Sequence, residues 1–178
     1  MNLKDIDLKD SKYKRIGILP YTKIKKEIFF FFSISSYDYE MGDFGGGIEK
    51  GEHPIHAALR EYEEESYNIF GTLCEKDIIH LKCLPNGNED NLTILYPFKS
   101  KNKEELYKLK LKFEQIYSTK TKPEELENCS ICFLNQLQLK NALMNFNDNI
   151  IDGIQYFKIY HILYNTLSCY TDYLVLLN

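Results

Sequence analysis

Two apolar segments near the start of the chain predict neighbouring β-strands. Residues 14–21 and 27–35 are rich in Ile, Phe and Tyr, and Pro20 and a short Lys-rich turn separate them. The second segment contains the run Ile28 to Phe32, in which apolar and polar residues do not alternate. Such a run is typical of a strand that is covered on both faces.

The next patterns predict a loop, a helix and a hairpin. Residues 42–51 are rich in glycine and predict a loop, and residues 54–67 predict a helix that begins at Pro54, where a missing N–H costs nothing. Residues 77–84 and 92–98 predict a hairpin, because the turn-forming Pro-Asn-Gly-Asn sequence lies between them.

The second half of the chain predicts two more helices and a strand. Residues 102–116 favour a helix, residues 130–134 a short strand, and residues 150–168 a C-terminal helix with apolar positions at helical spacing. There is no internal repeat and no long linker, so we expect one mixed α/β domain over residues 1–178.

Composition narrows the class of protein. The chain has 178 residues, 44% hydrophobic and 27% charged, which is typical of an ordinary globular domain. Its longest apolar run is too short to cross a bilayer and its first residues do not resemble a signal peptide, so we expect an intracellular, cytoplasmic protein without a membrane partner. Five irregularly spaced cysteines argue against a disulfide framework. Cys129 and Cys132 lack a second pair, and we interpret them as thiols of a strand and not as a zinc site.

The distribution of charge leaves two interpretations of one segment open. A net charge of −4 argues against general nucleic-acid affinity, so no DNA partner is expected. The segment of residues 99–122, called here the Lys-rich segment, nevertheless carries eight lysines against three glutamates. It is either a solvated helix face or a basic surface for RNA or polyphosphate, with Lys108, Lys110 and Lys112 as the candidate contacts. Arginine is rare in the chain, which makes Arg15 a further candidate for substrate binding and Arg60 a candidate for a special role.

The predicted helix after the glycine-rich stretch carries the candidate chemistry. Glu61, Glu64 and Glu65 are spaced i, i+3 and i+4, so their carboxylates project from one helix face. Carboxylates crowded in this way repel one another unless a cation lies between them, and hard oxygen ligands suit Mg²⁺ or Mn²⁺. The glycines let the backbone approach the same ion and the phosphates of a substrate. The alternative interpretation of an acidic run by itself is a solvated surface.

Two further residues of this segment predict a structural tie. Arg60 lies within the acidic helix, and Glu52 precedes it by eight residues, at the entrance of the helix. A pairing between them would fix the loop against the helix. The combination of this pair with the carboxylates and glycines at fixed offsets favours a functional site over a solvated face.

The spacing resembles the Nudix box, G-x5-E-x7-R-E-U-x-E-E-x-G-U, in which U is a bulky apolar residue. Its polar and glycine positions match without a gap over about residues 46–68, at Gly46, Glu52, Arg60, Glu61, Glu64 and Glu65. The glycine that ends the box is Tyr67 here. Because a left-handed Tyr costs about 1 kcal/mol and Asn tolerates this conformation better, we expect the helix to run one residue longer, with Asn68 as the left-handed residue.

The resemblance implies a fold and a chemistry. Nudix hydrolases are α/β/α sandwiches around a mixed β-sheet, and we expect extra helical segments toward the C-terminus of this chain. They use divalent metal ions to cut a diphosphate linkage in nucleotide-like substrates. By position, Glu61, Glu64, Glu65 and the carbonyl of Gly46 would bind Mg²⁺ or Mn²⁺, with Arg60 and Glu52 supporting the catalytic site. The family often adds a carboxylate from a later loop, for which the candidates are Glu124, Glu125 and Glu127.

The resemblance does not fix the substrate. Capped RNA is our first expectation, because the Lys-rich segment favours a large polyanion and large DNA viruses encode mRNA-decapping Nudix proteins. A pyrophosphatase for small nucleotides or dinucleoside polyphosphates is the alternative enzyme. The alternative of another class is a Nudix-fold module that binds nucleotide or RNA without catalysis.

Overall fold

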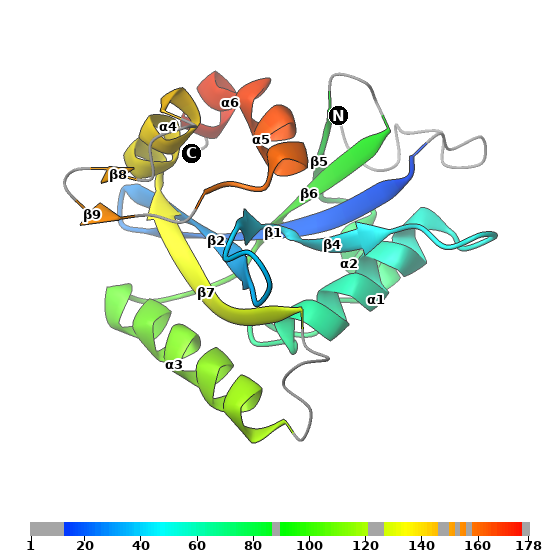
Figure 1. Cartoon of the computed structure of the whole chain (residues 1–178), viewed down its shortest axis with the longest axis horizontal. Helices are drawn as coiled ribbons and strands as arrows, with labels where there is room; N and C mark the ends of the chain where they lie inside the picture. The colour runs from blue at the N-terminus through cyan, green and yellow to red at the C-terminus, as the bar shows by residue number, and fades with distance from the viewer. Residues whose placement is uncertain are drawn as a thin grey trace.

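A mixed β-sheet lies at the centre of the fold, with helices on both of its faces (Figure 1). The computed structural model describes residues 13–86, 90–120, 127–145, 150–151, 154–155 and 158–175. The strands of the main sheet are β1 (Arg15–Ile24), β2 (Glu27–Ser35), β3 (Met41–Gly42), β4 (Phe44–Gly47), β5 (Lys82–Pro85), β6 (Asn91–Pro97) and β7 (Asn128–Asn135). The helices are α1 (Pro54–Ser66), α2 (Glu75–Ile78), α3 (Lys103–Thr119), α4 (Gln136–Met144), α5 (His161–Ser168) and α6 (Thr171–Val175).

The strand order of the main sheet is β3-β2-β1-β6-β5, with β4 paired to β1 and β7 paired to β2. The β1–β6 pair is parallel, and the other pairs of this sheet are antiparallel. The predicted α/β class with a mixed sheet is therefore confirmed. Helices α1, α2 and α3 lie on one side of the sheet and α4, α5 and α6 on the other, which is the expected α/β/α layering (Figure 1).

Strands β1 and β2 stay paired over only part of their length. Residues 21–24 of β1 pair with β2, but residues 15–18 pair with β4 instead, and residues 33–34 of β2 pair with β3. The segment of β3 and β4 therefore fills the space where β1 and β2 separate. The predicted glycine-rich loop of residues 42–51 is wrong in its first part, because these residues complete the sheet.

Each face of β2 supports a separate hydrophobic core. Phe29 and Phe31 belong to a core with residues of α1 and α3. Ile28, Phe30 and Phe32 belong to a second core with residues of α4, α5 and α6. The absence of alternation in this run thus has the predicted cause, which is burial of both faces.

The remaining predictions of helices and strands are confirmed in part. The first two strands are confirmed, as are the helix in the Lys-rich segment and the strand at residues 130–134. Cys129 and Cys132 lie in β7 as partly buried free thiols. The hairpin is formed by β5 and β6, but its first strand begins at Lys82 and not at Asp77, because residues 75–78 form α2. No helix of the described ranges is long and apolar enough to cross a membrane.

The prediction of one helix over residues 150–168 is wrong. Of the described residues in this range only those of α5 are helical, and α5 is preceded by a small antiparallel pair, β8 (Ile150–Ile151) and β9 (Ile154–Gln155). The sequence between these strands, Asp152-Gly153, is a dipeptide that favours tight turns. The apolar spacing of Ile151 and Ile154 fits a helix equally well, which is why periodicity misled the prediction.

Candidate active site

Helix α1 brings its carboxylates against the glycine-rich strand β4. The helix begins where His53 Nδ1 accepts a hydrogen bond from the N–H of Ile55 and Pro54 occupies the first turn. Glu61 points toward the sheet and is only 8% exposed. A Cβ atom at Gly46 would lie 2.5 Å from Glu61 Oε1, so any other residue at this position would displace the Glu61 carboxylate. The backbone of Gly46 is therefore next to a carboxylate, as the sequence predicts.

Arg60 connects the helix to the segment that precedes it. Its Nε and Nη2 each donate a hydrogen bond of 3.0 Å to the carboxylate of Glu52, and Nη2 also donates to the carbonyl of Gly47 at 3.2 Å. Nη1 donates to Glu61 at 2.7 Å and to Glu64 at 3.3 Å. The hydrogen bonds between Arg60 and Glu52 raise the pKa of the arginine and lower the pKa of the glutamate. The predicted pairing of Arg60 with Glu52 is present in the structure.

Glu65 faces the other end of β4. Its Oε2 accepts a hydrogen bond of 2.7 Å from the N–H of Gly45. Burial raises the pKa of the Glu65 carboxyl well above its usual range, and the nearby carboxyl of Glu127 raises it further, whereas Gly45 and Arg15 act in the opposite direction. Burial likewise raises the pKa of Glu61, despite its contact with Arg60. Both carboxyls therefore ionise less readily here than they would in water.

These acids line one cavity of about 300 Å³, which we call the carboxylate pocket. Its lining residues are Glu61, Glu64, Glu65, Tyr67, Lys120, Glu127 and Asn128. The structure thus brings the three acids of the helix together with Glu127 from the start of the β7 segment. The candidates Glu124 and Glu125 lie outside the described residues.

The donors of the carboxylate pocket fit a hard divalent cation. All four acidic side chains offer carboxylate oxygens, which suit Mg²⁺ or Mn²⁺, and their mutual repulsion would be relieved by an ion between them. Within the described ranges, no three His, Cys, Asp or Glu side chains are already gathered as a metal site. Arg60 donates hydrogen bonds to Glu61 and Glu64, and the N–H of Gly45 donates one to Glu65. Each carboxylate keeps further lone pairs that can bind an ion.

Asp43 is a site residue that the sequence reasoning missed. It is buried between β3 and β4, where its Oδ1 accepts a hydrogen bond of 2.6 Å from Arg15 and its Oδ2 one of 2.9 Å from Thr93. Arg15 also donates to the carbonyl of Gly45 at 2.9 Å. Arg15 therefore fixes β4 beside β1, while part of its side chain lines a second pocket. The signal was an aspartate inside an otherwise apolar and glycine-rich run.

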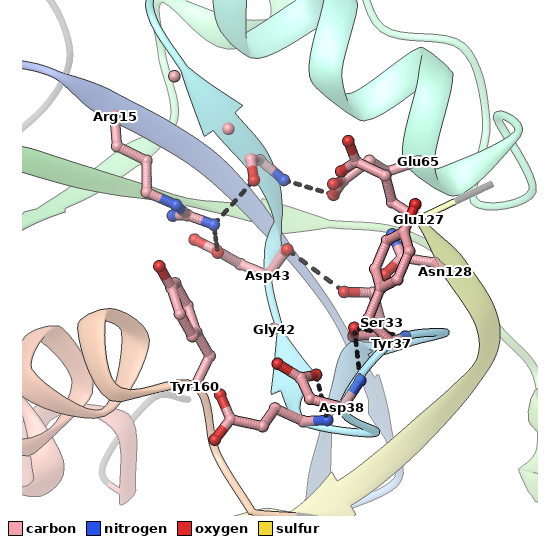
Figure 2. A pocket seen from close by; sticks show the side chains of 15 residues that line it. Arg15, Ser33, Tyr37, Asp38, Gly42, Asp43, Glu65, Glu127, Asn128 and Tyr160 are labelled. Atoms are coloured by element: carbon pink, nitrogen blue, oxygen red, sulfur yellow. Dashed lines mark hydrogen bonds and ion pairs between the residues drawn. The ribbon is translucent and has the colours of Figure 1, made fainter. Parts of the chain in front are cut away.

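This second pocket, of about 380 Å³, adjoins the first, and we call it the tyrosine pocket (Figure 2). Tyr160 lies on the side of Arg15, whose guanidinium is 5.7 Å from the ring centroid, and Tyr37 lies on the side of Glu127 and Asn128. The remaining lining residues are Ser33, Ser35, Asp38, Glu40, Gly42, Asp43, Gly45, Gly46, Gly47 and Glu65. Because the two pockets share Glu65, Glu127 and Asn128, one extended molecule can reach both.

Tyr67 ends α1 in the conformation that a glycine would normally supply. Its φ of 53° and ψ of 25° are left-handed, so the prediction that the helix runs one residue longer is wrong, although Asn68 is left-handed as predicted, with a φ of 55°. The ring of Tyr67 packs on Phe113 of α3 at 4.8 Å between centroids, and Lys120 Nζ lies 4.7 Å from its centroid. These contacts offset the backbone cost of about 1 kcal/mol.

Lys108, Lys110 and Lys112 of α3 do not line the carboxylate pocket. Lys108 pairs with Glu104 at 2.8 Å and Lys110 with Glu114 at 3.7 Å. Lys108 and Lys112 line a different cavity, beside Phe70 and Phe98. Among the described lysines only Lys120, which follows the last residue of α3, lines the carboxylate pocket.

No protein-family model and no curated protein sequence matches the chain. Several solved structures are similar to it. An Ap4A hydrolase of C. elegans is 13% identical, and the match covers 91% of this chain and 98% of that one, with a TM-score of 0.46. A NUDIX-family hydrolase from Clostridium perfringens is 19% identical over 94% of this chain and 99% of that one, with a TM-score of 0.39. The M. smegmatis Nudix hydrolase RenU is 10% identical over 73% and 74%, with a TM-score of 0.42. Identities and TM-scores this low leave the function to be inferred from the site itself.

Proposed function

We propose that this chain is a Nudix-type pyrophosphohydrolase that cuts a diphosphate linkage in a nucleotide-like substrate. The observation that carries the proposal is the carboxylate pocket. Four acids from α1 and the start of the β7 segment line one cavity beside a glycine strand, and Arg60 ties this helix to the strand. A solvated acidic face would have no reason to be buried against glycines or to gather a further carboxylate from a distant segment.

The residues of the pocket have distinct roles in this chemistry. A bound Mg²⁺ or Mn²⁺ supplies charge stabilisation for the phosphates and lowers the pKa of a bound water. Glu61, Glu64, Glu65 and the Gly46 carbonyl would hold it, with Glu61 and Glu65 already against β4. Glu65 or Glu127 would accept the proton of the attacking water. Arg60 and Glu52 keep the helix and its preceding segment in register and are positioning residues.

The tyrosine pocket supports a substrate with a nucleoside part. Its two tyrosines offer aromatic surfaces, and its serines and acids offer hydrogen-bond partners for a base or a sugar. Tyr37 is 72% exposed, an arrangement that leaves its ring accessible to a ligand. A nucleotide that occupies this pocket would direct its phosphates toward the shared residues Glu65, Glu127 and Asn128.

A product screen tests the proposal. The protein with Mg²⁺ or Mn²⁺ is incubated with capped RNA, dinucleoside polyphosphates and nucleoside triphosphates, and the products are separated by ion-exchange chromatography. We expect at least one substrate to give products of cleavage within its phosphate chain. Binding without turnover of any of them would favour the non-catalytic module instead.

Capped RNA is the finer proposal, because α3 leads from its lysines to Lys120 at the carboxylate pocket. Lys108 and Lys110 are paired only at the surface, so phosphates can compete for them. We expect replacement of Lys108, Lys110 and Lys112 by Gln to raise KM for capped RNA about 10-fold at low salt, with a smaller effect at high salt. A short dinucleotide cap analogue should be hydrolysed as before, because it cannot reach both places.

The measurement is kcat/KM for both substrates at two salt concentrations, in the wild type and the triple variant. Equal effects on the long and the short substrate would remove RNA guidance by α3. The favoured hypothesis would then be that the same site belongs to a pyrophosphatase for small nucleotides.

A further inference from the structure

Asn128 is buried with a hydrogen-bond donor that the described part of the chain leaves without a partner. The residue is 5% exposed, and its Nδ2 is one of two buried side-chain polar atoms in that part with no partner; the other is Thr22 Oγ1. A buried donor in this state costs about 1–3 kcal/mol. Such a cost is typical of a group that is kept for a ligand rather than for stability.

A local irregularity of the sheet directs this side chain. Cys132 and Leu134 of β7 belong to the core under α4, α5 and α6, and strict alternation would place residue 128 on that same face. The register of β7 with β2 shifts by one residue, however, so that Ile34 pairs with Ser130 but Ser35 with Asn128. This β-bulge reverses the alternation and places Asn128 in the carboxylate pocket, on the face of α1.

The position of Asn128 is where the two pockets meet. It lines the tyrosine pocket and the carboxylate pocket, next in sequence to Glu127. Its neighbours in both pockets, Glu65 and Glu127, are carboxyl groups and bring no cation to this point. The neutral amide of Asn128 can donate a hydrogen bond to an anionic oxygen at this point without adding a charge to the pocket.

We propose that Asn128 Nδ2 donates a hydrogen bond to a phosphate oxygen of the substrate and so recognises the diphosphate where it passes between the pockets. The inference rests on the proposed function and adds a specificity-determining residue to it. A phosphate oxygen is favoured over a base, because the amide lies at the carboxylates, whereas Tyr160 and Asp38 line only the tyrosine pocket.

The test is the substitution Asn128→Leu, which removes the donor at similar volume. Two non-hydrolysable probes are titrated with Mg²⁺ by calorimetry, methylenediphosphonate and α,β-methylene-ADP, and Tm is measured without ligand. We expect the Kd of both probes to rise about 10-fold, which corresponds to one lost hydrogen bond, and Tm to stay equal or rise. Asn165→Leu, the same change at an exposed position of α5, is the control and should alter neither Kd.

Each other outcome overturns the inference. If only the ADP analogue binds more weakly, Asn128 contacts the nucleoside. If Tm falls by several degrees, the amide stabilises the fold. If neither Kd changes, the amide does not contact the ligand. If the wild type binds neither probe, the site does not recognise a diphosphate. The product screen stands apart from these results. If the wild type hydrolyses a substrate but the variant binds both probes with unchanged Kd, the proposed enzymatic function stands and only the role of Asn128 is refuted.

Discussion

Replacing Glu64 by Gln is expected to reduce hydrolysis by about 1,000-fold, and EDTA should abolish hydrolysis in the wild type. The carboxylate is a ligand of the proposed ion, and an amide in its place leaves that ion short of one negative oxygen. The fold should stay intact, because the Glu64 side chain is 61% exposed and its contact with Arg60, at 3.3 Å, is the longest that Arg60 makes to a carboxylate. Rates are measured on the best substrate of the product screen, and folding by circular dichroism.

Glu63→Gln is the matched control for this experiment. Glu63 precedes Glu64 on α1 and is exposed, but it does not line the carboxylate pocket. We expect the control to hydrolyse at the wild-type rate. Full activity of Glu64→Gln, or of the wild type in EDTA, would contradict the assignment of a metal-dependent hydrolase.

Replacing Arg60 by Ala is expected to lower both stability and rate. The variant loses the paired hydrogen bonds to Glu52 and leaves Glu52, Glu61 and Glu64 without their shared cation. We expect the free energy of unfolding to fall by about 2 kcal/mol. For a chain of this length, that loss lowers Tm by roughly 6 °C. The rate should fall by about 100-fold, because the helix and the glycine strand are no longer held in register.

Arg60→Lys separates charge from geometry in this network. Lysine keeps the positive charge but cannot donate two parallel hydrogen bonds to Glu52, so both losses should be intermediate. Tm is measured by calorimetry and rates as above. A Tm of Arg60→Ala equal to that of the wild type would show that the network does not stabilise the fold.

The helix of the site could be predicted because its information is local. Glu61, Glu64 and Glu65 share a face through the period of the helix alone, and the same period places Arg60 where it can turn back to Glu52. Burial of both faces of β2 could be predicted for a similar reason, because the apolar run lies within the strand itself. In each case the residues that interact are few positions apart, or the feature depends on a single element.

The rest of the site depends on contacts between distant segments. Asp43 is identified by its partners Arg15 and Thr93, which come from β1 and β6, and nothing within its own segment indicates them. Asn128 reaches the pocket through a shift of register between two strands, which a single strand pattern does not reveal. Helix α4 did carry a local signal that was overlooked. Asn135 and Gln138 form a capping box at its start.

The end of α1 has a consequence for the order in which the molecule folds. A glycine at position 67 would let the helix stop by itself, whereas Tyr67 must take a left-handed conformation whose cost is offset only when its ring meets Phe113 and Lys120. Phe113 lies in α3, much later in the chain, and Lys120 follows the last residue of that helix. The last turn of α1, which holds Glu64 and Glu65, therefore gains its final geometry only after α3 has docked, and a nascent chain without α3 would leave this turn frayed.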